Sequence, residues 1–181
     1  MKKLFAILTA LCLLCCSAAV LAEAAPATEA QPLYLTPGVT FGMSQDEVIK
    51  AHGSAKFERD VEHIAGLSFD ELEYEDYDLM GSEAELHYYF MNNKLIGAQA
   101  QFDDDAAIFG KLQEKLTAEF GEGAKPDPAS LGNALYALDD EGSLSANTLA
   151  WITGDTIIVL EQENDGDVNL SCLNLAAEYV K

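Results

Sequence analysis

The chain has 181 residues, of which 49% are hydrophobic and 23% are charged. This composition excludes collagen-like, coiled-coil and wholly disordered classes, and its length fits one ordinary domain or two small related units. With 31 acidic against 10 basic residues, the net charge is -21. Such a charge argues against nucleic acid as a partner, because phosphates attract basic surfaces.

The N-terminal segment has the pattern of a bacterial export signal. Lys2 and Lys3 precede an uncharged apolar run over residues 4–21, and small residues stand before the first acidic residue. The pattern predicts a signal peptide over residues 1–22, with cleavage after Ala22 or alternatively after Ala24. We therefore expect an exported protein, periplasmic or extracellular, without stable membrane insertion after cleavage.

The four cysteines of the chain bear on lipid attachment and on disulfide formation. Cys15 and Cys16 follow an apolar run and offer a lipid-attachment alternative, although the residues before them are not the small ones that lipidation prefers. Cleavage leaves Cys172 alone in the mature chain, so no intrachain disulfide is expected. Cys172 alternates with Val168 and Leu170, which predicts a buried, inert thiol on one face of a strand.

After an Ala- and Pro-rich stretch read as a flexible spacer over residues 23–37, a first folded unit is expected over residues 38–102. Ser44 and Glu47 form a capping box, Met43 can pack on Val48, and Gly53 can end the helix. These signals predict a helix over residues 45–52. Alternating apolar residues then predict antiparallel strands over residues 67–79, 84–90 and 95–102, with a tight turn at residues 92–93.

A second unit is expected over residues 103–181. Asp103 to Asp105 provide an N-terminal cap, Ile108, Leu112 and Leu116 recur at helical spacing, and Gly121 ends the helix. Strands are expected over residues 134–138, 148–152, 156–163 and 168–175, with a tight turn over residues 164–167. The element order predicts an α+β fold of two helix-plus-antiparallel-strand units, with the helices packed on one face of an antiparallel sheet.

The segment from Pro37 to Ser44, continued by Glu47-Val48 and closed by Gly53, resembles the opening motif of the outer-membrane assembly lipoprotein (SmpA/OmlA) and β-lactamase-inhibitor-protein-like domains. In those families a short helical element packs on an antiparallel sheet, and the inhibitor protein carries two such units in tandem. The resemblance implies a non-enzymatic binding module that uses a sheet face or loops. It assigns no contact residue, because the motif covers only the entry to one helix.

The densest charge run, residues 70–78, holds the candidate binding residues. In a strand, Glu71, Glu73 and Glu75 share one face, and Tyr77 and Tyr89 can act as interface anchors. These residues predict a surface for a protein or peptide partner, basic in character. A calcium- or small-ligand-responsive envelope protein is the alternative, although same-face residues about 6.8 Å apart in one strand cannot wrap a calcium ion by themselves.

The sequence contains no pattern for catalysis, a metal or a cofactor. His52, His63 and His87 lack metal-ligand spacing, and neither a nucleophile elbow nor a phosphate or dinucleotide loop occurs. His52 is interpreted as a partly protonated group at a helix C-terminus. The expected function is thus an exported non-enzymatic protein- or peptide-binding module of the cell envelope or extracellular space.

Overall fold

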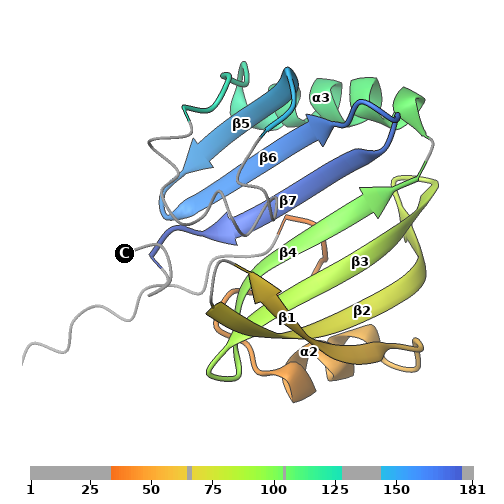
Figure 1. The fold of residues 1–181 in the computed structure, drawn as a ribbon, viewed down its shortest axis with the longest axis vertical. Helices are drawn as coiled ribbons and strands as arrows, with labels where there is room; N and C mark the ends of the chain where they lie inside the picture. Colours follow the sequence, from red (N-terminus) through yellow and green to blue (C-terminus); the bar gives the residue numbers. More distant parts are fainter. Residues whose placement is uncertain (1–33, 65–66, 104, 128–143, 177–181) are drawn as a thin grey trace, which may run out of the picture.

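The computed structural model describes residues 34–64, 67–103, 105–127 and 144–176. Within these ranges seven strands form one antiparallel sheet in the order β1-β2-β3-β4-β7-β6-β5. The sheet is twisted along its width, and both helices contribute to the core on the same side of it (Figure 1). The elements are α2 (Gln45–His52), β1 (Glu58–Ile64), β2 (Leu67–Leu79), β3 (Ser82–Met91), β4 (Lys94–Phe102), α3 (Ala106–Phe120), β5 (Asn147–Thr153), β6 (Thr156–Gln162) and β7 (Val168–Asn174).

The expected α+β fold of two helix-plus-sheet units is wrong. About 50% of the described residues are in strands and 18% in helices, so the fold is β-rich. The strands also form one sheet, because β4 pairs with β7 from Gly97↔Leu173 to Phe102↔Val168. This pairing satisfies backbone groups that two separate sheets would leave open at their edges. The prediction of antiparallel strands is confirmed.

The side of the sheet that faces the helices carries the hydrophobic core. Leu86, Tyr88 and Phe90 alternate along β3 and are fully buried. Val48 of α2 and Leu112 of α3 belong to the same buried cluster. Burial of each such side chain contributes about 1.5–3 kcal/mol to the free energy of folding. These buried contacts hold the two helices on the sheet.

Cys172 lies in this core, as the alternation in β7 predicts. It is completely buried together with Val168 and Leu170. Burial raises the pKa of its thiol to about 12, so the thiolate does not form near neutral pH.

The entry to α2 is built as its sequence indicates. The Glu47 backbone N–H donates to Ser44 Oγ at 3.4 Å, and the Ser44 N–H donates to Glu47 Oε2 at 2.9 Å, which completes the capping box. Gly53 ends the helix at a φ of 69°. Such a cap stabilises a short helix by about 1 kcal/mol.

His52 has a different role from the one its position in the sequence indicates. Its ring stacks on Tyr74 with centroids 4.1 Å apart, and its Nε2 lies 2.7 Å from the Tyr88 hydroxyl. Burial lowers the pKa of His52, so the neutral imidazole is favoured over a partly protonated one. The histidine therefore connects α2 to the sheet.

Strand β1 has no counterpart among the strands expected from the sequence. Its residues, Glu58 to Ile64, are mostly charged and lack an apolar alternation. The strand forms because it pairs along β2 in a continuous register, from Glu58↔Glu73 to Ile64↔Leu67. Tertiary pairing thus overrides a weak local signal.

Three further expectations concern the chain ends and connections. Asp105 occupies the N-cap of α3 but makes no side-chain capping hydrogen bond. The signal peptide, most of the spacer and the expected strand over residues 134–138 lie outside the described residues. In the described part of the chain, no helix is long and apolar enough to cross a membrane.

Candidate functional site

The face of the sheet opposite the helices gathers carboxylates from three neighbouring strands. Glu58 of β1 stands directly opposite Glu73 of β2, and Asp60 stands opposite Glu71. Like charges placed directly opposite each other destabilise a sheet. We call Glu58, Asp60, Glu71, Glu73 and, from β3, Glu85, together with His87 and Tyr89, the acidic face; within it Glu71 is buried, at 5% exposed.

His87 lies between carboxylates at the centre of the acidic face. Its Nδ1 lies 2.8 Å from Glu71 Oε1, and its Nε2 lies 3.9 Å from Glu85 Oε2. Burial by itself lowers the pKa of His87, but the hydrogen bond to Glu71 and the charges of Glu71, Glu73 and Glu85 outweigh it, so the pKa lies above its ordinary value. The surrounding carboxylates therefore favour the protonated form of His87, which would partly neutralise them.

The remaining carboxylates stay crowded. Burial raises the pKa of Glu73, and the charges of Glu85, Glu71 and Glu58 add to this effect, while His87 opposes it. The acidic face therefore holds more negative charge than its one imidazole can balance. A positively charged ligand would relieve this repulsion.

Tyr89 borders the same face. Its ring lies nearly parallel to the His87 ring with centroids 6.5 Å apart, and its hydroxyl donates to Gln99 Oε1 at 3.2 Å. Because Tyr89 stands opposite Glu71 in the sheet register, it adds an aromatic surface next to the carboxylates.

A β-bulge in β2 changes the rest of the expected site. The pairing between β2 and β3 shifts register between Tyr74 and Tyr77, and Asp76 has a φ of 52°. The extra residue reverses the alternation, so Tyr77 pairs with Ala84 and lies on the helix side together with Tyr74. Of the predicted set, Glu71, Glu73 and Tyr89 share the acidic face, whereas Glu75 lies in the bulge and Tyr77 behind it.

The bulge forms one wall of a groove with a volume of about 870 Å³. The opposite wall is the connection from α2 to β1, which contributes Lys56 and Phe57. We call this cavity the bulge groove. Its lining residues are Ser54, Ala55, Lys56, Phe57, Glu58, Glu73, Tyr74, Glu75, Asp76, Tyr77 and Asp78.

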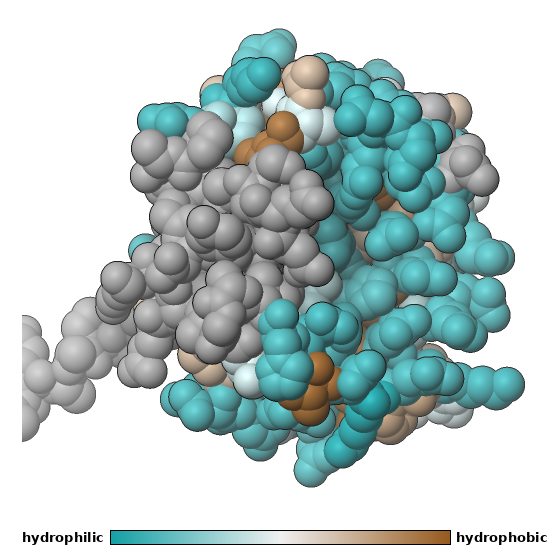
Figure 2. All heavy atoms as spheres, viewed as in Figure 1, coloured by the Kyte–Doolittle hydropathy of each residue, from teal (hydrophilic) through white to brown (hydrophobic). Residues whose placement is uncertain are grey.

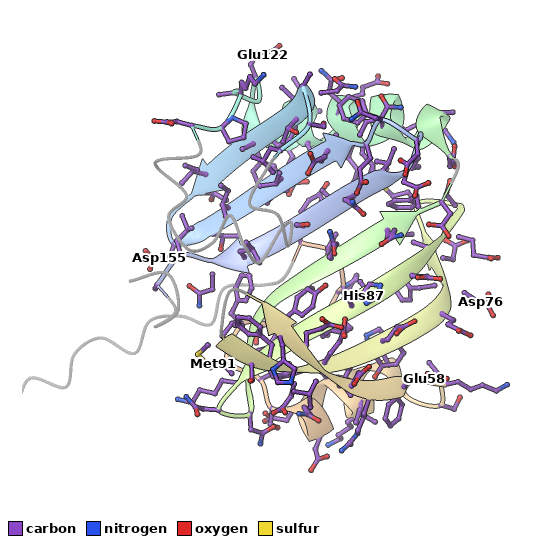
Figure 3. All side chains as sticks on the ribbon, viewed as in Figure 1. Glu58, Asp76, His87, Met91, Glu122 and Asp155 are labelled. Carbon is purple, nitrogen blue, oxygen red and sulfur yellow. The ribbon has the colours of Figure 1, made fainter. Side chains whose placement is uncertain are left out.

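Glu73, Glu75 and Tyr77 from the predicted set therefore meet in the bulge groove. Tyr74 also lines it, and its buried hydroxyl has no hydrogen-bond partner among the described residues. An unsatisfied hydroxyl of this kind costs about 1–3 kcal/mol unless a ligand or a water supplies a partner. Figure 3 shows Glu58, Asp76 and His87 in the half of the molecule formed by β1 to β4.

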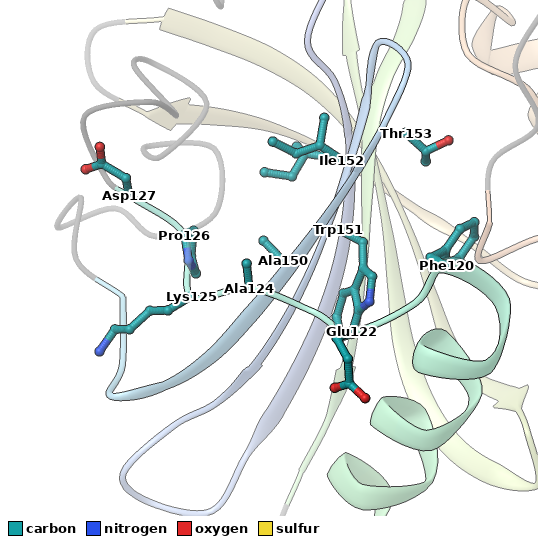
Figure 4. A pocket seen from close by; sticks show the side chains of 11 residues that line it. Phe120, Glu122, Ala124, Lys125, Pro126, Asp127, Ala150, Trp151, Ile152 and Thr153 are labelled. Atoms are coloured by element: carbon teal, nitrogen blue, oxygen red, sulfur yellow. The ribbon is translucent and has the colours of Figure 1, made fainter.

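A second groove, with a volume of about 570 Å³, lies between β5 and the segment that follows α3 (Figure 4). Ile152 is 65% exposed beside it, and Trp151 contributes a buried wall. Glu122, Lys125 and Asp127 give its rim nearly balanced charge. The charged residues that line this groove are thus fewer and more nearly balanced than those of the bulge groove.

The described residues hold no group of three or more His, Cys, Asp or Glu side chains that could bind a metal ion. Their surface in the view of Figure 2 is mostly hydrophilic, with small separate apolar patches. The groups that the acidic face and the bulge groove present are thus carboxylates and aromatic rings.

Sequence reasoning missed His87, Glu85, Glu58 and Phe57 as members of these surfaces. The alternation of Glu85 and His87 with the buried Leu86 indicates their face, but not that β2 places Glu71 and Glu73 beside them. Glu58 and Phe57 were missed because their strand was not predicted. Only the sheet pairing reveals these neighbours.

Comparison of the chain with protein-family models, with curated proteins and with solved structures finds no match.

Proposed function

We propose that the chain is an exported, non-enzymatic module of the cell envelope or extracellular space that binds a basic segment of a protein or peptide on its acidic face. The observation that carries this proposal is the facing of Glu58 with Glu73 and of Asp60 with Glu71. Each pair costs stability in the free protein, and a bound cationic segment would remove that cost. The resemblance of the opening motif to envelope lipoprotein and inhibitor-protein domains supports the same class of function.

The shape of the site also supports a peptide rather than a small molecule. The carboxylates are distributed over three adjacent strands instead of converging on one point. An extended segment with cations at intervals can contact such a surface along its length. Tyr89 offers an aromatic contact beside these charges.

The test compares two triple variants with the same change in charge. The first, Asp60→Asn/Glu71→Gln/Glu85→Gln, removes three of the five carboxylates of the acidic face, and none of the three lines the bulge groove. The second, Glu114→Gln/Glu122→Gln/Asp155→Asn, neutralises three exposed carboxylates elsewhere. Glu122 and Asp155 lie in the half of the molecule formed by β5 to β7 (Figure 3).

Fluorescence anisotropy with a labelled peptide of alternating Lys and Ser would measure the binding. We expect the acidic-face triple to bind roughly tenfold more weakly, the control triple to change by less than about twofold, and added salt to weaken binding throughout. Equal weakening by both triples would show that only the net charge matters and would overturn the proposal.

A further inference from the structure

The geometry points to the bulge groove as a binding subsite for a guanidinium group, supplied by an arginine side chain of the bound segment. This inference rests on the proposed function for its basic partner, and it names the residue type and the pocket that receives it. The groove lies at the end of the acidic face, because Glu58 and Glu73 line the groove and also belong to that face. A segment bound across the face can therefore place one side chain in the groove.

The walls of the groove are aromatic. Phe57, Tyr74 and Tyr77 line it, and the rings of Phe57 and Tyr74 have centroids 5.9 Å apart. His52 stacks behind Tyr74 and stands edge-on to Tyr77, with ring centroids 5.7 Å apart for the latter pair. These contacts position Tyr74 and Tyr77 before a ligand binds, whereas Phe57 is 36% exposed.

The charge of the groove is strongly negative. Five carboxylates line it, from Glu58, Glu73, Glu75, Asp76 and Asp78, against the ammonium of Lys56 and the Arg59 guanidinium that lies near the Phe57 ring. Glu75 and Asp76 are exposed in the bulge, whereas Asp78 Oδ1 already accepts the Gly81 N–H at 3.2 Å. Glu75 and Asp76 are therefore the carboxylates best placed to receive a cation.

A second observation, separate from the carboxylates, also indicates a ligand. Tyr74 is only 1% exposed and lines the groove, and no residue in the described part of the chain hydrogen-bonds its hydroxyl. Buried hydroxyls are rarely left in this state, because their desolvation is not compensated. A donor group entering the groove would supply the missing hydrogen bond.

The chain itself indicates a guanidinium rather than an ammonium ion. The Arg59 guanidinium carbon lies 5.6 Å from the centroid of the Phe57 ring, so this aromatic wall already accepts that group from its own side. A guanidinium is planar, stacks on aromatic rings and donates hydrogen bonds in several directions at once. Several carboxylates and one hydroxyl around aromatic rings fit this donor pattern better than the compact charge of lysine.

The test uses three small probes with the full chain. These are the N-acetyl, N-methylamide derivatives of arginine, of lysine and of citrulline, which is the neutral counterpart of arginine. NMR titration would follow the backbone amide signals of Phe57, Asp76 and Tyr77. We expect saturable shifts with arginine, binding of lysine weaker by about threefold or more, and no saturable shift with citrulline.

Two variants and one control locate the subsite. Glu75→Gln/Asp76→Asn removes two charges, and asparagine tolerates the left-handed backbone at position 76. Tyr74→Phe removes only the hydroxyl. We expect each to weaken arginine binding by roughly fivefold, whereas Glu122→Gln/Asp155→Asn, with the same charge change at a distance, should leave it unchanged.

Three results would overturn the subsite. They are equal affinity for the arginine and lysine derivatives, saturable binding of the citrulline derivative, or equal weakening of arginine binding by Glu122→Gln/Asp155→Asn. The two proposals fail separately. Loss of Lys-Ser peptide binding in the acidic-face triple, without arginine binding in the groove, would retain the proposed function and reject the subsite. Saturable arginine binding, with peptide binding indifferent to that triple, would retain the groove and reject the acidic face.

Discussion

Trp151 is held from two directions, which makes its neighbouring glycine sensitive to any side chain. Its Nε1–H donates to the Gly121 carbonyl oxygen at 2.8 Å. A Cβ atom at Gly123 would lie 2.5 Å from the indole Cζ2. Because that hydrogen bond fixes the ring, the indole cannot easily move away.

We therefore expect Gly123→Ala to reduce the free energy of unfolding by roughly 2 kcal/mol, as overpacking typically does. The matched control is Gly110→Ala within α3, where a Cβ atom would meet nothing within 4 Å. There alanine should stabilise the helix by about 0.5–1 kcal/mol. Urea denaturation measures both, and similar effects of the two substitutions would contradict this account of the indole.

His87 makes stability depend on pH. Its pKa is raised in the folded protein, so the native state binds the proton more tightly than the unfolded chain does. The stabilisation is complete below the unfolded value, about pH 6.5, and is lost as pH rises through the higher native value. The free energy of unfolding that His87→Gln removes should thus be largest near pH 5.5 and smaller above neutrality.

Denaturation of the wild type and of His87→Gln at several values from pH 5.5 to 8.5 measures this difference. His52, whose pKa is lowered by burial, titrates in both proteins and cancels in the comparison. A difference that stays constant or grows with pH would show that the pairing of His87 with its carboxylates is not a source of stability.

At the scale of the element, the bulge of β2 decides what the groove contains. Without the extra residue, Tyr77 would point to the acidic face and away from His52. The backbone of Asp76 supports the bulge by adopting a φ of 52°, in the region that disfavours most side chains. The irregular strand is therefore what brings three aromatic rings together with the acidic bulge.

We expect Asp76→Val to destabilise the protein by about 1–2 kcal/mol, because a β-branched side chain opposes the left-handed conformation. Asp76→Gly should be tolerated, since glycine adopts that conformation freely. Glu75→Val is the control, because it places valine at the neighbouring position, where φ is not positive. Thermal unfolding of the three variants would contradict the explanation if both valine substitutions cost the same.

At the scale of the whole molecule, the continuous sheet joins the two halves of the chain. Residues 34–102 and 105–176 meet where β4 pairs with β7, and their helices share one buried cluster. Unfolding one half would expose the core of the other and leave the edge of β4 or β7 unpaired. The halves should therefore unfold together.

Trp151, the only tryptophan, reports on the second half alone. We expect urea transitions followed by its fluorescence and by far-ultraviolet circular dichroism to coincide within error, with a single midpoint. A dichroism transition that extends beyond the fluorescence transition would show two separately folding units.

Local patterns predict most single elements of this fold. The capping box of α2, the alternation in β3 and the burial of Cys172 depend on residues close in sequence, and all three agree with the structure. β1 was missed, because its charged residues form a strand only by pairing with β2. The α+β class was wrong, because neighbouring residues do not reveal that β4 pairs with β7.

The candidate site divides in the same way. The sequence by itself determined the acidic character of the chain and the common face of Glu71 and Glu73, because strand alternation is a local property. Only the tertiary structure decided that His87 balances them, that a bulge turns Tyr77 away, and that Phe57 closes a groove. These features depend on the register between strands and on side chains distant in sequence, which the pairing of the whole sheet sets.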